Sequence, residues 1–271
     1  MKRGIVVLVL ILSFLSFGCT QKIVKPTPTP ALDNILQKGE LVLGTAGSMP
    51  PLNMTTKGGE VIGFEVDLAR MMADAMGVKL KIETMQFSEL LSALEKGKVD
   101  LVMSGMTITP KRNLKVAFVG PYYVSGKAFL TKIETIANAK EATEVNSANT
   151  RLTALKGSTS QYFVETVLPK VQFIPAKDYN EAVGLVLKGK VDAMVADYPI
   201  CVVSLLRHPN QGLLSIFTPL TYEPIGIAMP SYDPHLVNWM ENFLDMLDET
   251  GGLDQLTERW FEDASWLKRL P

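Results

Sequence analysis

Residues 96–112 read KGKVDLVMSGMTITPKR, and the order of residue types in this stretch decides the fold that the sequence predicts. A polar turn at Lys96–Lys98 leads into a short apolar strand, Val99–Met103. Ser104 and Gly105 follow the strand, and such small residues let a ligand approach the backbone closely. The stretch therefore predicts a strand that ends at a binding loop.

The end of the same stretch predicts the start of a helix. Thr109 is a suitable N-cap, and Pro110 suits the first helical position. Arg112 then falls in the first turn. Free N–H groups at a helix N-terminus and a nearby guanidinium both attract an anion. We therefore expect an anion-binding site at this point.

The first five residues of the stretch, KGKVD, occur a second time at Lys188–Asp192. The second copy continues through an apolar strand to Asp197, which precedes Tyr198 and Pro199. One copy thus leads to an arginine and the other to an aspartate. The repeat indicates two structurally similar halves that carry opposite charges.

Strands and helices alternate in both halves, which predicts mostly parallel sheets covered by helices. In open sheets of this kind, ligands bind beyond the carboxyl ends of the strands. The C-terminal helices have no counterpart after the first half, so we expect them to pack on the first lobe. The expected division is residues 38–128 with 226–271 for lobe 1 and 129–225 for lobe 2, joined by a hinge of two strands.

The N-terminus has the pattern of an export signal. Lys2 and Arg3 precede an apolar run of 13 residues, Ile5–Phe17, which is too short to span a bilayer. Gly18 and Cys19 follow, so we expect a signal peptide over residues 1–18 and a lipid-anchored cysteine, although an ordinary signal with an incidental cysteine stays open. Residues 19–37 include a Pro/Thr-rich segment that predicts an extended linker.

Composition excludes several classes of function. The 271 residues are 47% hydrophobic and 20% charged with a net charge of −1, the profile of a soluble globular protein without a basic patch for nucleic acid. The only cysteines are Cys19 and Cys201, and no cysteine–histidine cluster suggests a metal site. We expect no disulfide, no metal and no cofactor, and a monomer.

The two charged positions suit a zwitterion. Arg112 can hold a carboxylate with two parallel hydrogen bonds, and Thr159 can support the same group from the other half. Asp197 can accept hydrogen bonds from an ammonium. The carbonyls of Ser104 and Gly105 and the hydroxyl of Thr107 can complete the ammonium shell. Ligand binding between lobes would close the hinge.

Each of these residues also has a purely structural interpretation. Arg112 can be a solvated arginine at a helix start, Asp197 can cap the helix after Pro199, and Thr159 can be a simple N-cap. Phe87 and Met49 can belong to the core. The residues taken singly leave these alternatives open.

Longer motifs resemble one family in order and spacing. They are GFEVDLARMMADAMG, FSELLSALEKGKVDLVMSGMTITPKR, FVGPYY, GSTS, KGKVDAMVADYP and GLDQLTERWF, which together span about residues 38–262. In these motifs the chain resembles the family 3 extracellular solute-binding proteins, the amino-acid receptors of ABC importers. The resemblance implies an α/β, two-lobed, type II periplasmic-binding-protein fold in which each lobe is a mixed, mostly parallel sheet flanked by helices.

The resemblance also implies roles for individual residues. Arg112 would bind the α-carboxylate of an amino acid, with Thr159 and the GST loop around Ser158 in support. Asp197 would bind the α-amino group, and Phe87 would line one side of the ligand. This chain departs from the family where the ligand side chain lies, because Ala46 and Met49 replace an acid and an aromatic residue. We therefore expect a small or apolar ligand side chain.

Two functions compete at this point. The first is a binding protein, exported and lipid-anchored on the outer side of the membrane, that delivers an amino acid to an ABC permease or reports it to a membrane sensor. The second is an enzyme similar to cyclohexadienyl dehydratases, which needs a general acid in the cleft. The histidines, His208 and His235, both adjoin prolines in surface-like segments. The binding protein is the expected function.

Overall fold

The first lobe is built around a five-stranded sheet. The computed structural model describes residues 29–216 and 220–271, so the expected signal peptide and Cys19 lie outside the described residues. The strand order is β5 (Lys79–Thr84), β1 (Glu40–Thr45), β6 (Leu101–Val102), β13 (Glu223–Met229) and β7 (Ala117–Ser125). A small antiparallel sheet beside it consists of β2 (Ser48–Met49), β3 (Asn53–Thr55) and β4 (Val61–Ile62).

The second lobe repeats this plan. Its order is β10 (Gln172–Ala176), β9 (Arg151–Leu155), β11 (Ala193–Asp197), β8 (Lys127–Thr131) and β12 (Leu214–Ser215). In each large sheet one strand runs against the other four, namely β13 in lobe 1 and β8 in lobe 2. These are the strands that enter each lobe from the other one, so the expected mostly parallel sheets and the hinge of two strands are confirmed.

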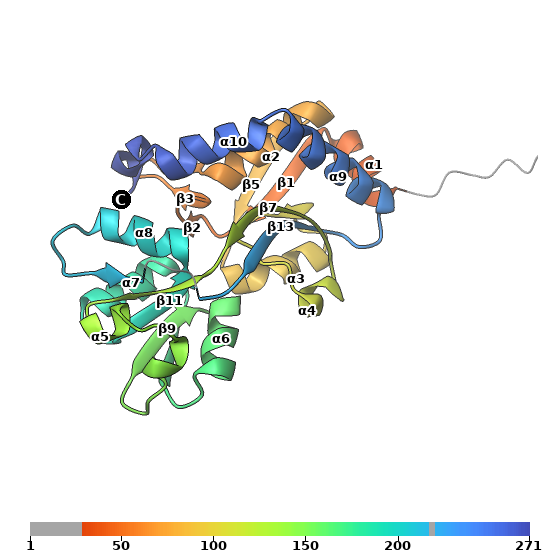
Figure 1. Ribbon diagram of the computed structural model, residues 1–271. Coiled ribbons are helices and arrows are strands. Elements are labelled where there is room, and N and C mark those ends of the chain that lie inside the picture. Colours follow the sequence, from red (N-terminus) through yellow and green to blue (C-terminus); the bar gives the residue numbers. More distant parts are fainter. Residues whose placement is uncertain (1–28, 217–219) are drawn as a thin grey trace, which may run out of the picture.

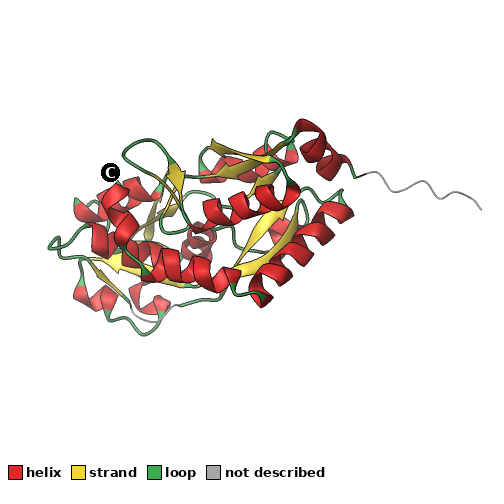
Figure 2. Cartoon of the chain, turned by 90° about the horizontal axis from the view of Figure 1, so that it is seen from above, coloured by secondary structure: helices red, strands yellow, loops and turns green. Residues whose placement is uncertain are grey.

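Helices flank both sheets (Figures 1 and 2). Those of lobe 1 are α1 (Pro30–Lys38), α2 (Phe64–Met76), α3 (Leu90–Glu95), α4 (Pro110–Asn113), α9 (Pro234–Glu249) and α10 (Gly252–Thr257). Those of lobe 2 are α5 (Glu134–Ala137), α6 (Thr159–Val167), α7 (Tyr179–Leu187) and α8 (Tyr198–Arg207). Short 3-10 or π turns are η1 (Phe87–Glu89), η2 (Ala142–Val145), η3 (Glu258–Glu262) and η4 (Ser265–Arg269).

The C-terminal helices pack on lobe 1, as expected. The apolar side chains Leu236, Met240 and Trp260 share one buried cluster with Leu41 of β1 and Phe64 of α2. These residues come from segments on both sides of lobe 2 in the sequence, so the core of lobe 1 is built from two separate parts of the chain. In Figure 1, α9 and α10 lie along the top of lobe 1 beside α1 and α2.

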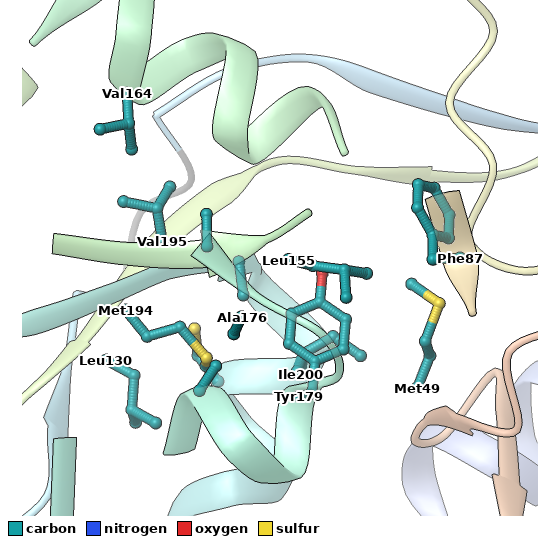
Figure 3. Close-up of a cluster of buried hydrophobic side chains, with 14 of the residues drawn as sticks. Met49, Phe87, Leu130, Leu155, Val164, Ala176, Tyr179, Met194, Val195 and Ile200 are labelled. Carbon is teal, nitrogen blue, oxygen red and sulfur yellow. The ribbon is translucent and has the colours of Figure 1, made fainter. Parts of the chain in front are cut away.

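A second buried cluster joins the two lobes. It contains Met49 and Phe87 of lobe 1 together with Leu155 and Tyr179 of lobe 2, and Figure 3 shows these side chains facing one another. The lobes are therefore in direct contact. No helix in the described part of the chain is long and apolar enough to cross a membrane.

Candidate ligand-binding site

Arg112 lies between the lobes, but the helix in which it lies does not provide the anion site that the sequence predicts. Thr109 is the N-cap, since its hydroxyl accepts from Arg112 N at 3.2 Å. However, α4 has only four residues, which is too short for an anion site at its N-terminus, and Arg112 within it is partly buried. The anion site therefore depends on the guanidinium itself.

The guanidinium of Arg112 is oriented by both lobes. Its Nη1 donates to Thr107 O at 2.8 Å and its Nη2 to Gly157 O at 3.3 Å, while Cζ lies 5.7 Å from the centre of the Phe87 ring. Burial lowers the pKa of Arg112 to about 10, and the negative charges of Glu223 and Asp197 oppose this effect. No carboxylate of the described residues forms an ion pair with it. A ligand carboxylate would supply the missing partner.

Two threonines meet across the gap between the lobes. Thr107 Oγ1 lies 3.3 Å from Thr159 Oγ1, and because Thr159 donates its hydroxyl hydrogen to Glu223, Thr107 is the donor. The structure assigns the capping role to Ser158, whose hydroxyl accepts from Gln161 N at 3.1 Å and donates to Leu155 O at 2.7 Å. Thr159 therefore does not cap the helix, and its hydroxyl faces the site.

Asp197 also lacks the structural role that was open for it. It occupies the N-cap position of α8, but its side chain caps nothing. Instead Asp197 Oδ1 accepts from Lys127 Nζ at 2.7 Å, and only 4% of Asp197 is exposed. The aspartate is thus a buried anion at the end of β11, on the lobe opposite to Arg112.

Sequence reasoning missed Lys127 and Glu223. Lys127 Nζ lies 3.3 Å from Glu223 Oε2, which also accepts from Thr159 Oγ1 at 3.0 Å. Thr221 Oγ1 donates to the other oxygen of Glu223 at 3.0 Å. Each charged residue begins a hinge strand whose other residues are mostly apolar. Two opposite charges at the starts of two buried strands were the signal that could have found the pair.

The remaining predicted residues line the apolar side of the site. Ser104 Oγ donates to Met49 Sδ at 3.3 Å and accepts from Ala46 N at 2.9 Å, so this hydroxyl holds the loop together. Gly105 N donates to Glu65 Oε1 at 2.7 Å. Met49 and Phe87 are 1% and 5% exposed. They form the apolar wall opposite Tyr179.

A pocket of about 250 Å³ opens beside Phe87. It is lined by residues of both lobes: Ala46, Ser48, Thr84, Met85, Gln86, Phe87, Lys177 and Asp178. Its place next to the Arg112–Phe87 contact suits a ligand side chain that extends away from the charged groups. Within residues 29–216 and 220–271, no group of three histidine, cysteine or acidic side chains could hold a metal ion.

Gly157 forms the closest approach of the loop before α6 to lobe 1. Its φ is +79°, and a Cβ at this position would lie 3.1 Å from Ser88 Cβ and 3.2 Å from Ser88 Cα. Such contacts are tight, because well-packed interiors have no spare space. The absence of a side chain at Gly157 thus permits the lobes to meet.

Gly157→Ala is therefore expected to weaken ligand binding about tenfold, because overpacking of this contact costs about 1–3 kcal/mol in the closed form. Gly189→Ala is the matched control, since Gly189 has φ +64° in the same lobe with no atom within 4 Å. Both variants should lose similar stability through backbone strain, and only Gly157→Ala should lose affinity in calorimetric titration. Equal affinities in the two variants would contradict the closure role.

The fold and the site define a class of protein: a two-lobed receptor with opposite charges on facing lobes. Its sequence matches the profile of the bacterial extracellular solute-binding proteins, family 3, over residues 41–263. The chain belongs to this family. The match spans both lobes and most of the C-terminal helices.

Individual relatives include receptors and one enzyme. The chain is 25% identical to a cyclohexadienyl dehydratase of Pseudomonas aeruginosa over 85% of its own length and 86% of the relative's. It is 25% identical to ABC transporter arginine-binding protein 1 of Escherichia coli, with 80% and 89% coverage. A solved structure from Wolinella succinogenes, a putative ABC-transporter binding component complexed with lysine, has a TM-score of 0.80, 38% identity and coverage of 85% and 99%.

Proposed function

We propose that this protein captures a free amino acid between its lobes and delivers it to an ABC importer. The observation that carries the proposal is the partly buried guanidinium of Arg112, which forms no ion pair with a carboxylate of the described residues and lies on the lobe opposite to Asp197. The carboxylate of the ligand would pair with Arg112. The ammonium of the ligand would donate to the oxygen of Asp197 that Lys127 does not contact. Membership of the family supports this function.

The ligand side chain would occupy the pocket beside Phe87. Met49 and Ala46 are apolar, and the pocket contains one acid, Asp178, and one base, Lys177. Ala46 and Met49 favour a small or apolar side chain, whereas five of the eight residues that line the pocket are polar, namely Ser48, Thr84, Gln86, Lys177 and Asp178. The relatives named for arginine and lysine make those amino acids the critical competitors, and tightest binding of either would overturn this part of the proposal.

The cellular setting rests on the N-terminus. We infer that residues 1–18 are a cleaved signal, that Cys19 carries a lipid, and that residues 19–37 connect this anchor to the lobes. The lobes would comprise residues 38–128 with 226–271 and residues 129–225. An ABC permease would be the membrane partner. Metabolic labelling with a fatty acid, with Cys19→Ser as the control, tests the anchor.

A thermal-shift screen of the purified protein against the twenty amino acids tests the binding function. Ligand at about 1,000 times its Kd should add roughly 4 kcal/mol to the free energy of unfolding, because it binds only the folded state. We expect a clear rise in melting temperature with at least one amino acid. No response to any of them would reject the proposal.

The dehydratase relative makes enzymatic activity the second candidate. Its test uses prephenate and arogenate in the same screen, followed by measurement of turnover. Binding without turnover supports a receptor, since recognition by Arg112 and Asp197 needs no proton transfer. Turnover that depends on Glu223, a cleft carboxylate that could act as general acid, would establish the enzyme instead.

A further inference from the structure

The part of the site that would bind the ligand's ammonium contains a cation of its own, Lys127, which the recognition of a zwitterion does not require. Lys127 is 1% exposed, and its ammonium contacts Asp197 at 2.7 Å and Glu223 at 3.3 Å. A buried ammonium is stable only when carboxylates surround it, and here two of them do. Lys127 is therefore a fixed part of the site.

Hydrogen bonds hold two members of the ion triad of Lys127, Asp197 and Glu223 in place, namely Lys127 and Glu223. Lys127 N donates to Thr221 Oγ1 at 3.0 Å, and Thr221 in turn donates to Glu223 at 3.0 Å. Thr159 holds the other oxygen of Glu223 at 3.0 Å. The triad thus links both hinge strands to the threonine pair at the site.

Because of Lys127, the ligand does not have to provide a cation for Asp197. In a site that contained only Arg112 and Asp197, closure around a carboxylate without an ammonium would bury Asp197 unpaired, at a large cost. Here Asp197 stays paired with the ammonium of Lys127 even when the ligand has no ammonium group. The four charges of Arg112, Lys127, Asp197 and Glu223 also sum to zero without a ligand.

We propose that Lys127 is a specificity-determining residue that extends the ligand class to carboxylates without an α-amino group, namely 2-hydroxy and 2-oxo acids. The ligand carboxylate pairs with Arg112, and its hydroxyl or carbonyl oxygen lies beside Lys127 and the Thr107–Thr159 pair. An α-amino group adds a hydrogen bond to Asp197 and is not required. This inference rests on the proposed role of Arg112.

Matched pairs of ligands test the inference by calorimetric titration. Suitable pairs are L-arginine with argininic acid, L-leucine with its 2-hydroxy analogue, L-phenylalanine with phenyllactate, and L-glutamate with 2-hydroxyglutarate. In the wild-type protein we expect the Kd values of the best-binding pair to differ by about 10- to 100-fold, the effect of one added charged hydrogen bond. In Lys127→Met this ratio should rise at least about another tenfold in favour of the amino acid, because Asp197 and Glu223 both lose their cation.

Two further variants secure the interpretation. Lys132→Met replaces an exposed lysine that follows the same strand and should leave the ratio of the two Kd values at its wild-type value. The double variant Lys127→Met/Glu223→Gln removes one charge of each sign, so it answers the question if Lys127→Met does not fold. It should show the same increased preference for the amino acid.

The outcomes separate this inference from the proposed function. A wild-type preference for the amino acid above about 1,000-fold, or a ratio that stays equal in the Lys127 variants, would overturn it. Binding of hydroxy acids without binding of any amino acid would reject the proposed amino-acid function and support the inference. Binding of neither class would remove both.

Discussion

Replacement of Arg112 by methionine is expected to weaken ligand binding at least about 100-fold, or roughly 3 kcal/mol, because the ligand carboxylate would be buried without its partner. The guanidinium is preorganised for this contact by the carbonyls of Thr107 and Gly157 and by the Phe87 ring. A preorganised donor loses little entropy when the ligand binds. Titration of the best ligand of the screen measures the change.

The same variant should not destabilise the ligand-free protein. Burial lowers the pKa of Arg112 to about 10, which means that the folded state disfavours its charge. Removal of a buried cation without a paired carboxylate therefore costs little stability. A function-specific residue thus shows a loss of affinity with an unchanged melting temperature.

Lys111→Met is the matched control for this experiment, since Lys111 is the exposed neighbour on the same helical turn. It removes the same charge at nearly the same place and should change the affinity less than about threefold, because exposed charges are screened by salt. A similar loss of affinity in both variants would show that only the overall charge matters. Unchanged affinity in Arg112→Met would exclude Arg112 from the site.

Elements with local start and stop signals were predictable from the sequence. From apolar periodicity and local start signals the sequence predicts a helix at Tyr179–Leu187 and a strand at Glu223–Met229, and the structure has both elements with these bounds. Asp178 caps the helix by accepting from Glu181 N at 2.8 Å, a contact fixed by residues three apart. Signals of this kind need no knowledge of the rest of the chain.

In the stretch Lys96–Arg112 the strand is shorter than predicted, and the helix begins at Pro110 as predicted but lasts only four residues. The strand expected at Val99–Met103 is reduced to Leu101–Val102, although the backbone N–H groups of Asp100 and Met103 still donate to β1. The helix after Pro110 ends within one turn because it has no buried residue, and the next side chain, Leu114, is 87% exposed. Capping residues start a helix, but only packing of an apolar face extends it.

The charged site was predictable only in part. Arg112, Thr107 and Thr159 come together as the sequence indicated. The ion triad of Lys127, Asp197 and Glu223 joins residues up to 96 positions apart across two hinge strands, and a single sequence contains no local signal for that register. Tertiary geometry therefore determines what Asp197 faces.

The second large effect, a loss of stability, is expected from the replacement of Glu65, which holds the loop at Gly105 in place by a hydrogen bond. Glu65 is fully buried on α2 and accepts hydrogen bonds from Asn53 Nδ2 at 2.6 Å, from Gly105 N at 2.7 Å and from the hydroxyl of Tyr122. Glu65→Ala should lower the free energy of unfolding by about 3–5 kcal/mol, because three buried donors lose their acceptor. Chemical denaturation measures this loss, and Asp74→Ala on the exposed side of the same helix should change stability by less than about 0.5 kcal/mol.

The pH dependence gives an independent test of Glu65. Burial raises its pKa above the usual 4.5, and the hydrogen bonds from Tyr122, Gly105 and Asn53 oppose this effect only in part. The folded state then holds the proton more tightly than the unfolded state, so stability falls as the pH rises from 4.5 through the raised pKa. Glu65→Gln cannot titrate, and the stability advantage of the wild-type protein over this variant should therefore shrink with rising pH across that window. An advantage that grows with pH would show that the hydrogen bonds outweigh burial, and Glu65 would then hold the Gly105 loop as a stable carboxylate.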